Sequence, residues 1–146
     1  MRVQKSIDIA APPERIWPFF TNPDKILQWS IIFRKFEYTS DRRSGVGTPI
    51  YIEEKAGGPL MKMNFEVTEW VENEKIGLRM TSGPMLKSYE QRWTLQRTPS
   101  GSTFTFMEDL GLPFGPIGKL IGRMMQRSSE AFIDRMLPKI KMLAEA

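Results

Sequence analysis

Three polar residues on otherwise apolar segments are the first candidates for chemistry. Tyr89 and Gln91 alternate with bulky apolar residues in one segment, and Glu108 shares its phase with two phenylalanines in the next. Residues two apart lie on one face of a strand, so these polar groups share a face with their apolar neighbours. They point either into an internal cavity, where they orient a ligand's hydroxyl or carbonyl, or toward a cavity mouth or strand end, where water solvates them.

The chemistry open to these side chains is acid/base chemistry. Glu108 and Tyr89 are the candidates for a general acid or base, with Gln91 orienting a carbonyl. Burial beside aromatic rings would raise the pKa of Glu108 and suit it to that role. The chain has no His and no Cys, which excludes imidazole bases, thiol nucleophiles, zinc-finger sites and disulfides.

Two acidic doublets, Glu53–Glu54 and Glu108–Asp109, are weaker signals. Adjacent residues of a strand face opposite ways, so at most one member of each doublet points inward. Pro49 leaves the phase of the first doublet's strand open. Neither doublet therefore predicts a paired-carboxylate site or an oxygen-ligand metal cage, and the sequence predicts no metal site and no cofactor.

Size and composition indicate one globular domain spanning residues 1–146. The chain is 40% hydrophobic and 26% charged, with a formal net charge of +4. Such a charge permits attraction to anionic ligands or lipid surfaces but requires neither. Charges interrupt the N-terminal residues, and no apolar run approaches the length of about 18 residues typical of a membrane span, so we expect a cytoplasmic protein.

The elements that must position the candidates follow from periodicity. Residues 2–9 alternate as a strand, and prolines and turn signals predict two short helices within residues 11–20 and 24–28. Six β-rich segments separated by short turns predict an antiparallel meander. They are residues 31–38, 48–54, 60–70, 75–81, 87–97 and 102–109. Apolar spacing of three and four over residues 117–143 predicts one long helix, bent at Pro138.

Five stretches in this order resemble a known family. They are residues 6–17, Trp29, residues 45–48, residues 67–70 and residues 92–95. Together with the terminal helix, they resemble the START/Bet v 1-like (SRPBCC) superfamily, specifically its bacterial polyketide cyclase/dehydrase and lipid-transport branch. The resemblance covers essentially the full chain. It implies an α+β helix-grip fold, in which a curved seven-stranded antiparallel sheet wraps around the long C-terminal helix.

The resemblance also implies an apolar cavity between the sheet and the C-terminal helix, holding a lipid, sterol, polyketide or similar molecule. Methionines on the inward faces are core filling or an adaptable lining for such a ligand. We assign the cavity walls to twelve residues that we expect to face inward from the sheet and the helices. They are Trp17, Phe33, Met63, Phe65, Leu78, Tyr89, Gln91, Trp93, Phe106, Glu108, Met124 and Phe132.

Three functions remain open on the sequence. The first is binding, and with it transport or sensing, of a hydrophobic or amphipathic small molecule. The second is an enzyme of the cyclase or dehydratase type that uses Glu108 or Tyr89; the absence of histidine departs from many family cyclases. The third is a protein-interaction module that uses the basic helix or the loop around Gly83 and Pro84.

Two segments near the predicted cavity carry further expectations. Residues 111–118 are a lid at the cavity mouth or a plain connection. Lys119, Arg123 and Arg127, four residues apart, form a solvated stripe or contact an anionic membrane transiently. Aromatic residues fall on the buried phase, which argues against nucleic-acid binding. We expect a monomer or a homodimer.

Overall fold

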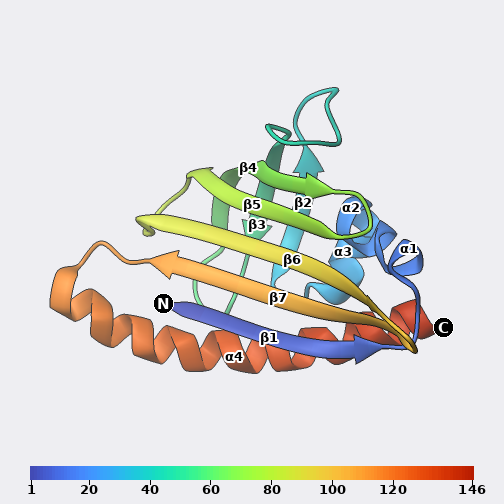
Figure 1. Cartoon of the computed structure of the whole chain (residues 1–146). Coiled ribbons are helices and arrows are strands. Elements are labelled where there is room, and N and C mark those ends of the chain that lie inside the picture. Colours follow the sequence, from blue (N-terminus) through green and yellow to red (C-terminus); the bar gives the residue numbers. More distant parts are fainter.

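One strand, three short helices, six further strands and a long helix follow one another in the computed structural model, which describes residues 1–146 (Figure 1). The strands are β1 (Arg2–Ile9), β2 (Phe33–Tyr38), β3 (Pro49–Glu54), β4 (Met61–Val71), β5 (Lys75–Ser82), β6 (Ser88–Thr98) and β7 (Gly101–Gly111). The helices are α1 (Pro13–Ile16), α2 (Pro18–Thr21), α3 (Pro23–Trp29) and α4 (Gly115–Glu145).

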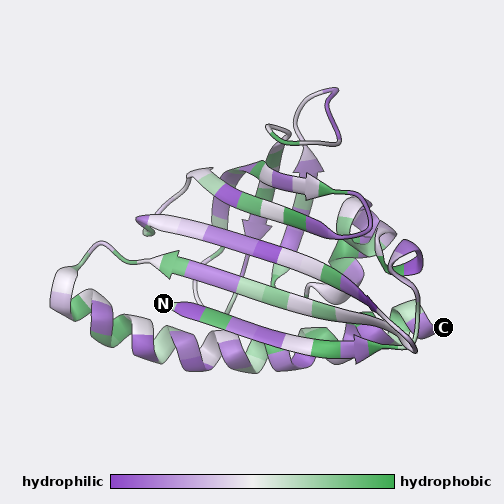
Figure 2. Ribbon diagram, in the orientation of Figure 1, coloured by the Kyte–Doolittle hydropathy of each residue, from purple (hydrophilic) through white to green (hydrophobic).

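All seven strands form one antiparallel sheet in the order β1-β7-β6-β5-β4-β3-β2. The sheet curls, α4 runs alongside β1, and α1 to α3 lie near the C-terminal end of α4 (Figure 1). Apolar and hydrophilic residues alternate along the strands, as expected of a sheet with one buried face (Figure 2). The predicted helix-grip fold is confirmed.

The hairpin between β6 and β7 shows how local sequence fixes this topology. Thr98 pairs with Gly101 across a two-residue turn, and Gly101 has a φ of +148°. A Cβ atom built at this position lies 2.2 Å from the carbonyl oxygen of Ile9. Only glycine lets the turn sit so close to the end of β1.

The helical segment after β1 differs in detail from the prediction. Pro18 cannot continue the helix begun at Pro13, so residues 11–20 form two one-turn helices, α1 and α2, in place of one. The side chain of Asn22 then caps α3, accepting a hydrogen bond of 3.0 Å from the backbone N–H of Asp24.

The core is filled at one end of the molecule by aromatic side chains. The ring of Trp29 lies 5.3 Å from that of Trp93 and 5.7 Å from that of Phe104, and its indole N–H donates to the carbonyl of Phe19. The large buried side chains of α4 all fall between Ile133 and Ile140, in its C-terminal half. The N-terminal half of α4 therefore spans a part of the sheet that this core does not fill.

Candidate functional site

A cavity of about 370 Å³ opens under the N-terminal half of α4. This volume falls within the range typical of small-molecule sites. The lining comes from the ends of β3, β4, β6 and β7, the loops after β3, β5 and β7, and one face of α4. The lining residues are Glu54, Ala56, Gly57, Gly58, Pro59, Met61, Met85, Leu86, Tyr89, Glu108, Leu110, Leu112, Phe114, Ile121, Met125, Ser128, Ser129 and Phe132.

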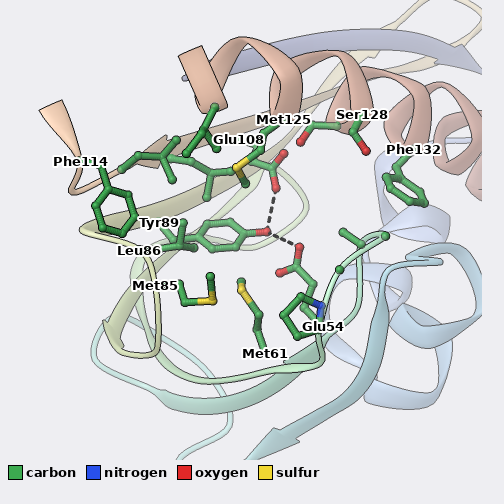
Figure 3. Close-up of a pocket in the computed structure, with 18 residues that line it drawn as sticks. Glu54, Met61, Met85, Leu86, Tyr89, Glu108, Phe114, Met125, Ser128 and Phe132 are labelled. Atoms are coloured by element: carbon green, nitrogen blue, oxygen red, sulfur yellow. Dashed lines mark hydrogen bonds between the residues drawn. The ribbon is translucent and has the colours of Figure 1, made fainter. Parts of the chain in front are cut away.

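Glu54, Tyr89 and Glu108 form one polar wall of the cavity (Figure 3), and a chain of buried hydrogen bonds continues behind it. The hydroxyl of Tyr89 lies 2.7 Å from Oε1 of Glu108 and 3.1 Å from Oε1 of Glu54. Nε2 of Gln91 donates to the Tyr89 oxygen at 2.7 Å, and the indole N–H of Trp93 donates to Oε1 of Gln91 at 2.9 Å. We refer to Glu54, Tyr89 and Glu108 as the acidic trio.

Strand register explains how the trio assembles. Gln91 pairs with Glu108 across β6 and β7, so Tyr89, two residues earlier on the same face, lies diagonal to Glu108. Glu54 is the last residue of β3, where the burial pattern alternates to place it on the inner face. The curl of the sheet brings this end of β3 opposite β6 and β7 (Figure 3).

The hydrogen positions in the trio follow from counting protons. Tyr89 has one hydroxyl proton and therefore cannot donate to two carboxylates. The shorter contact assigns that proton to Glu108, and the Tyr89 oxygen then faces Glu54 as an acceptor. This contact is favourable when Glu54 is a carboxylic acid whose proton lies on Oε1.

Electrostatics agrees with this assignment. Burial and the nearby Glu108 raise the pKa of Glu54 to about 8. A hydrogen bond from Tyr89 would oppose this rise only if its hydroxyl donated to an ionised Glu54; with that proton on Glu108, the Tyr89 oxygen accepts from Glu54 and favours the protonated acid. Burial also raises the pKa of Glu108, while hydrogen bonding to Tyr89 and Ser129 favours its ionised form. Burial and the two carboxyls raise the pKa of Tyr89 well above its ordinary value. Glu54 therefore holds a proton at neutral pH.

One oxygen of the trio has no partner. Oε2 of Glu54 is buried, and no protein group lies in hydrogen-bonding position to it. With the proton on Oε1, Oε2 is a carbonyl oxygen that can only accept. Buried polar atoms without a partner are uncommon in folded proteins and cost stability, so this atom marks a place where a ligand donor would fit.

Three of the twelve residues predicted as cavity walls line this cavity: Tyr89, Glu108 and Phe132. Gln91 and Trp93 lie behind the lining, in the hydrogen-bond chain. Six further members are buried in the core and do not line the cavity, because other side chains cover them. They are Trp17, Phe33, Met63, Phe65, Leu78 and Phe106.

The wall assignment of Met124 needs correction. Its side chain is 69% exposed, and the next residue, Met125, lines the cavity. The helical spacing carries the reason: Ile121, Met125, Ser129 and Phe132 recur at three and four, which puts them on one face of α4, whereas Met124 lies about one hundred degrees away.

Sequence reasoning missed Glu54 as a partner of Glu108. The signal was present in the alternation of Ile50, Ile52 and Glu54, which share the inner face of β3. Its outer neighbour Glu53 accepts a hydrogen bond from the hydroxyl of Tyr51. Each acidic doublet thus contributes one inward carboxyl. The two inward carboxyls, Glu54 and Glu108, face the same Tyr89 hydroxyl.

The loop between β7 and α4, for which a lid or a plain connection was predicted, borders the cavity. Leu112 and Phe114 are lining residues, and Phe114 is 57% exposed at the mouth. Gly118 and Gly122 pack against Leu112, since Cβ atoms at these positions would lie 3.4 and 3.5 Å from its side chain. These are ordinary van der Waals distances, so the loop lies close against α4 without requiring glycine at either position.

Comparison with known families identifies the chain. The family model for polyketide cyclase/dehydrase and lipid transport matches residues 1–144. The chain belongs to this family. A search of curated proteins finds no match.

Solved structures show the same fold at low sequence identity. The protein TTHA0849 from Thermus thermophilus superposes with a TM-score of 0.81, 18% identity, and coverage of 99% of this chain and 97% of its own. A START superfamily protein from Mycobacterium smegmatis superposes with a TM-score of 0.75 and 16% identity, covering 97% of this chain and 98% of its own. The Zhui aromatase/cyclase from Streptomyces sp. R1128 superposes with a TM-score of 0.78 and 12% identity, covering 99% of this chain and 93% of its own. The START/Bet v 1-like fold of this family member is thereby established. None of its helices is long and apolar enough to cross a membrane.

Proposed function

We propose that this protein binds a hydrophobic or amphipathic small molecule in the cavity under α4, as a carrier or a sensor. The observation that carries the proposal is a mostly apolar cavity that ends on a buried polar trio with one unpartnered oxygen. The apolar walls would hold the body of the ligand, and the trio would orient its polar end. The residues that were predicted as walls but lie in the core would support the cavity indirectly, by keeping the sheet curved around the lining residues.

Uptake of Nile red, an uncharged dye that fluoresces in apolar surroundings, tests this proposal. Met125→Trp places an indole in the cavity and should abolish dye uptake. Met124→Trp adds the same indole on the exposed side of α4 and serves as the matched control. Dye uptake by the wild type and Met124→Trp, with none by Met125→Trp, is the expected result. Equal uptake by all three would refute the assignment.

The surface around the mouth supports transient membrane contact during ligand exchange. The first turns of α4 carry two exposed basic residues: Arg123, one turn after Leu120, and Lys119, farther around the helix. Five apolar side chains from the β7–α4 loop and these turns are also exposed. The five are Phe114, Ile117, Leu120, Ile121 and Met124. Apolar and basic side chains together suit an anionic lipid surface. Co-flotation with vesicles containing phosphatidylglycerol, but not with pure phosphatidylcholine vesicles, is expected; flotation with neither would refute the contact.

A second candidate function is acid/base catalysis of the cyclase or dehydratase type. It is favoured by the acidic trio, because a carboxyl with a pKa of about 8 beside an ionisable partner is suited to proton transfer near neutral pH. Native mass spectrometry of a bound molecule over time discriminates the two functions. A mass that falls by one water in the wild type, but not in Glu108→Gln, supports the enzyme; an unchanged mass supports the carrier.

A further inference from the structure

We propose that the cavity selects a hydrophobic molecule whose polar end is a protonated amine, with Glu54 and Glu108 as its counter-ions. The inference rests on the proposed binding function and names the chemical class of the ligand.

The charges around the cavity give the first reason. The ionisable side chains among the lining residues are Glu54, Tyr89 and Glu108, and all three are acids; no Lys or Arg lines the cavity. A ligand that ends in a carboxylate would bring another negative charge into a buried acidic site, where repulsion is strong. A ligand that ends in an ammonium group would compensate the charge already there.

Hydrogen bonding gives the second reason. Oε2 of Glu54 is a buried acceptor with no donor, and the remaining polar lining groups on α4 are the hydroxyls of Ser128 and Ser129. An ammonium group has three donors and no acceptor. It can therefore satisfy the orphan oxygen and still donate to neighbouring oxygens, whereas a carboxylate has no proton to offer.

The environment of Glu54 sets how binding depends on pH. Glu108 from β7 and Tyr89 from β6 face it, Phe33 of β2 and Met61 of β4 are its neighbours in the sheet, and none of these carries a positive charge. In the free protein the Glu54 carboxyl is neutral because it holds a proton. When the ammonium binds, Glu54 gives up that proton to solvent and becomes the carboxylate that pairs with the ligand. One proton is released as one positive charge enters.

Decylamine, decanol and decanoate test the selection, because they share one apolar chain and differ in the polar end. Isothermal titration in two buffers of different ionisation enthalpy gives both the affinity and the protons released. We expect decylamine to bind at least about tenfold more tightly than the other two at neutral pH and to release a proton. The affinity for decylamine should rise about tenfold for each pH unit up to about pH 7, because the ammonium group and the proton compete for the Glu54 carboxylate.

Two variants assign the effect to Glu54. Glu54→Gln should lose the proton release and should reduce the preference for decylamine, because Glu108 is then the only counter-ion; its fold is checked by circular dichroism. Glu53→Gln, which changes the adjacent outward carboxyl, should keep both.

The outcomes separate this inference from the proposed function. Nile red uptake with decanoate bound as tightly as decylamine, or with decanol bound equally and no proton released, overturns the amine selection alone. Failure of the wild type to bind Nile red and all three decyl compounds overturns the proposed function, and the selection with it.

Discussion

Replacing Glu54 by glutamine should stabilise the protein at neutral pH. The glutamine side chain has the shape of the protonated carboxyl: its amide N–H can donate to the Tyr89 oxygen, as the acid proton does, and its carbonyl can occupy the position of Oε2. The substitution therefore keeps the hydrogen bond across the trio and removes only the capacity to ionise.

The size of the effect follows from the raised pKa. The carboxyl of Glu54 has an ordinary pKa of 4.5 and a folded pKa of about 8. Because the folded state holds the proton more tightly than the unfolded chain does, the contribution of Glu54 to stability is full below about pH 4 and falls as the pH rises toward about 8. Each pH unit in that window costs about 1.4 kcal/mol, so Glu54→Gln should exceed the wild type by about 3 kcal/mol at pH 7.

Urea unfolding monitored by tryptophan fluorescence, at pH values from about 5 to 8, measures this difference. The gap between Glu54→Gln and the wild type should be small at about pH 5 and should widen steadily with pH. Glu53→Gln is the control, because Glu53 lies on the outer face and its substitution should leave the wild-type slope unchanged. Parallel stability curves for Glu54→Gln and the wild type would refute the buried, protonated carboxyl.

Three further substitutions test how the fold positions the site. Tyr89→Phe removes the hydroxyl shared by two buried carboxyls and should lower the free energy of unfolding by about 1–3 kcal/mol in urea; no change would contradict the hydrogen-bond chain. Asn22→Ala removes the cap of α3 and should cost about 1 kcal/mol in the same assay. Gly101→Ala should lower the stability by more than about 1 kcal/mol in thermal unfolding, because its Cβ would meet the Ile9 carbonyl. Gly58→Ala is the control: a Cβ there has no neighbouring atom within 4 Å, so the melting temperature should stay unchanged.

The antiparallel order of β2 to β7 and the long helix were predictable because their signals are local, whereas the pairing of β1 with β7 joins distant parts of the chain. Alternation identified each strand, and short turns required antiparallel neighbours. The split at Pro18 was less visible, since a one-turn helix leaves little periodicity before it ends. The family resemblance supplied the curl of the sheet around α4, which no local pattern contains.

The cavity was harder to locate than the fold. Inward phase identifies the residues that face the interior, but it does not distinguish filled core from empty space. Phe33, Phe65 and Phe106 face inward and are covered by other side chains. Glu54 and Glu108 meet only because strands distant in sequence approach across the curled sheet. Their pairing is a property of tertiary structure that neither doublet reveals alone.

Native mass spectrometry of the protein, as purified and after incubation with decanol, tests the binding claim most directly. The wild type and Met124→Trp should each carry one small molecule per chain, and Met125→Trp should have the bare mass of the polypeptide. Bare masses for all three proteins, or the same adduct on all three, would contradict a ligand-binding cavity under α4.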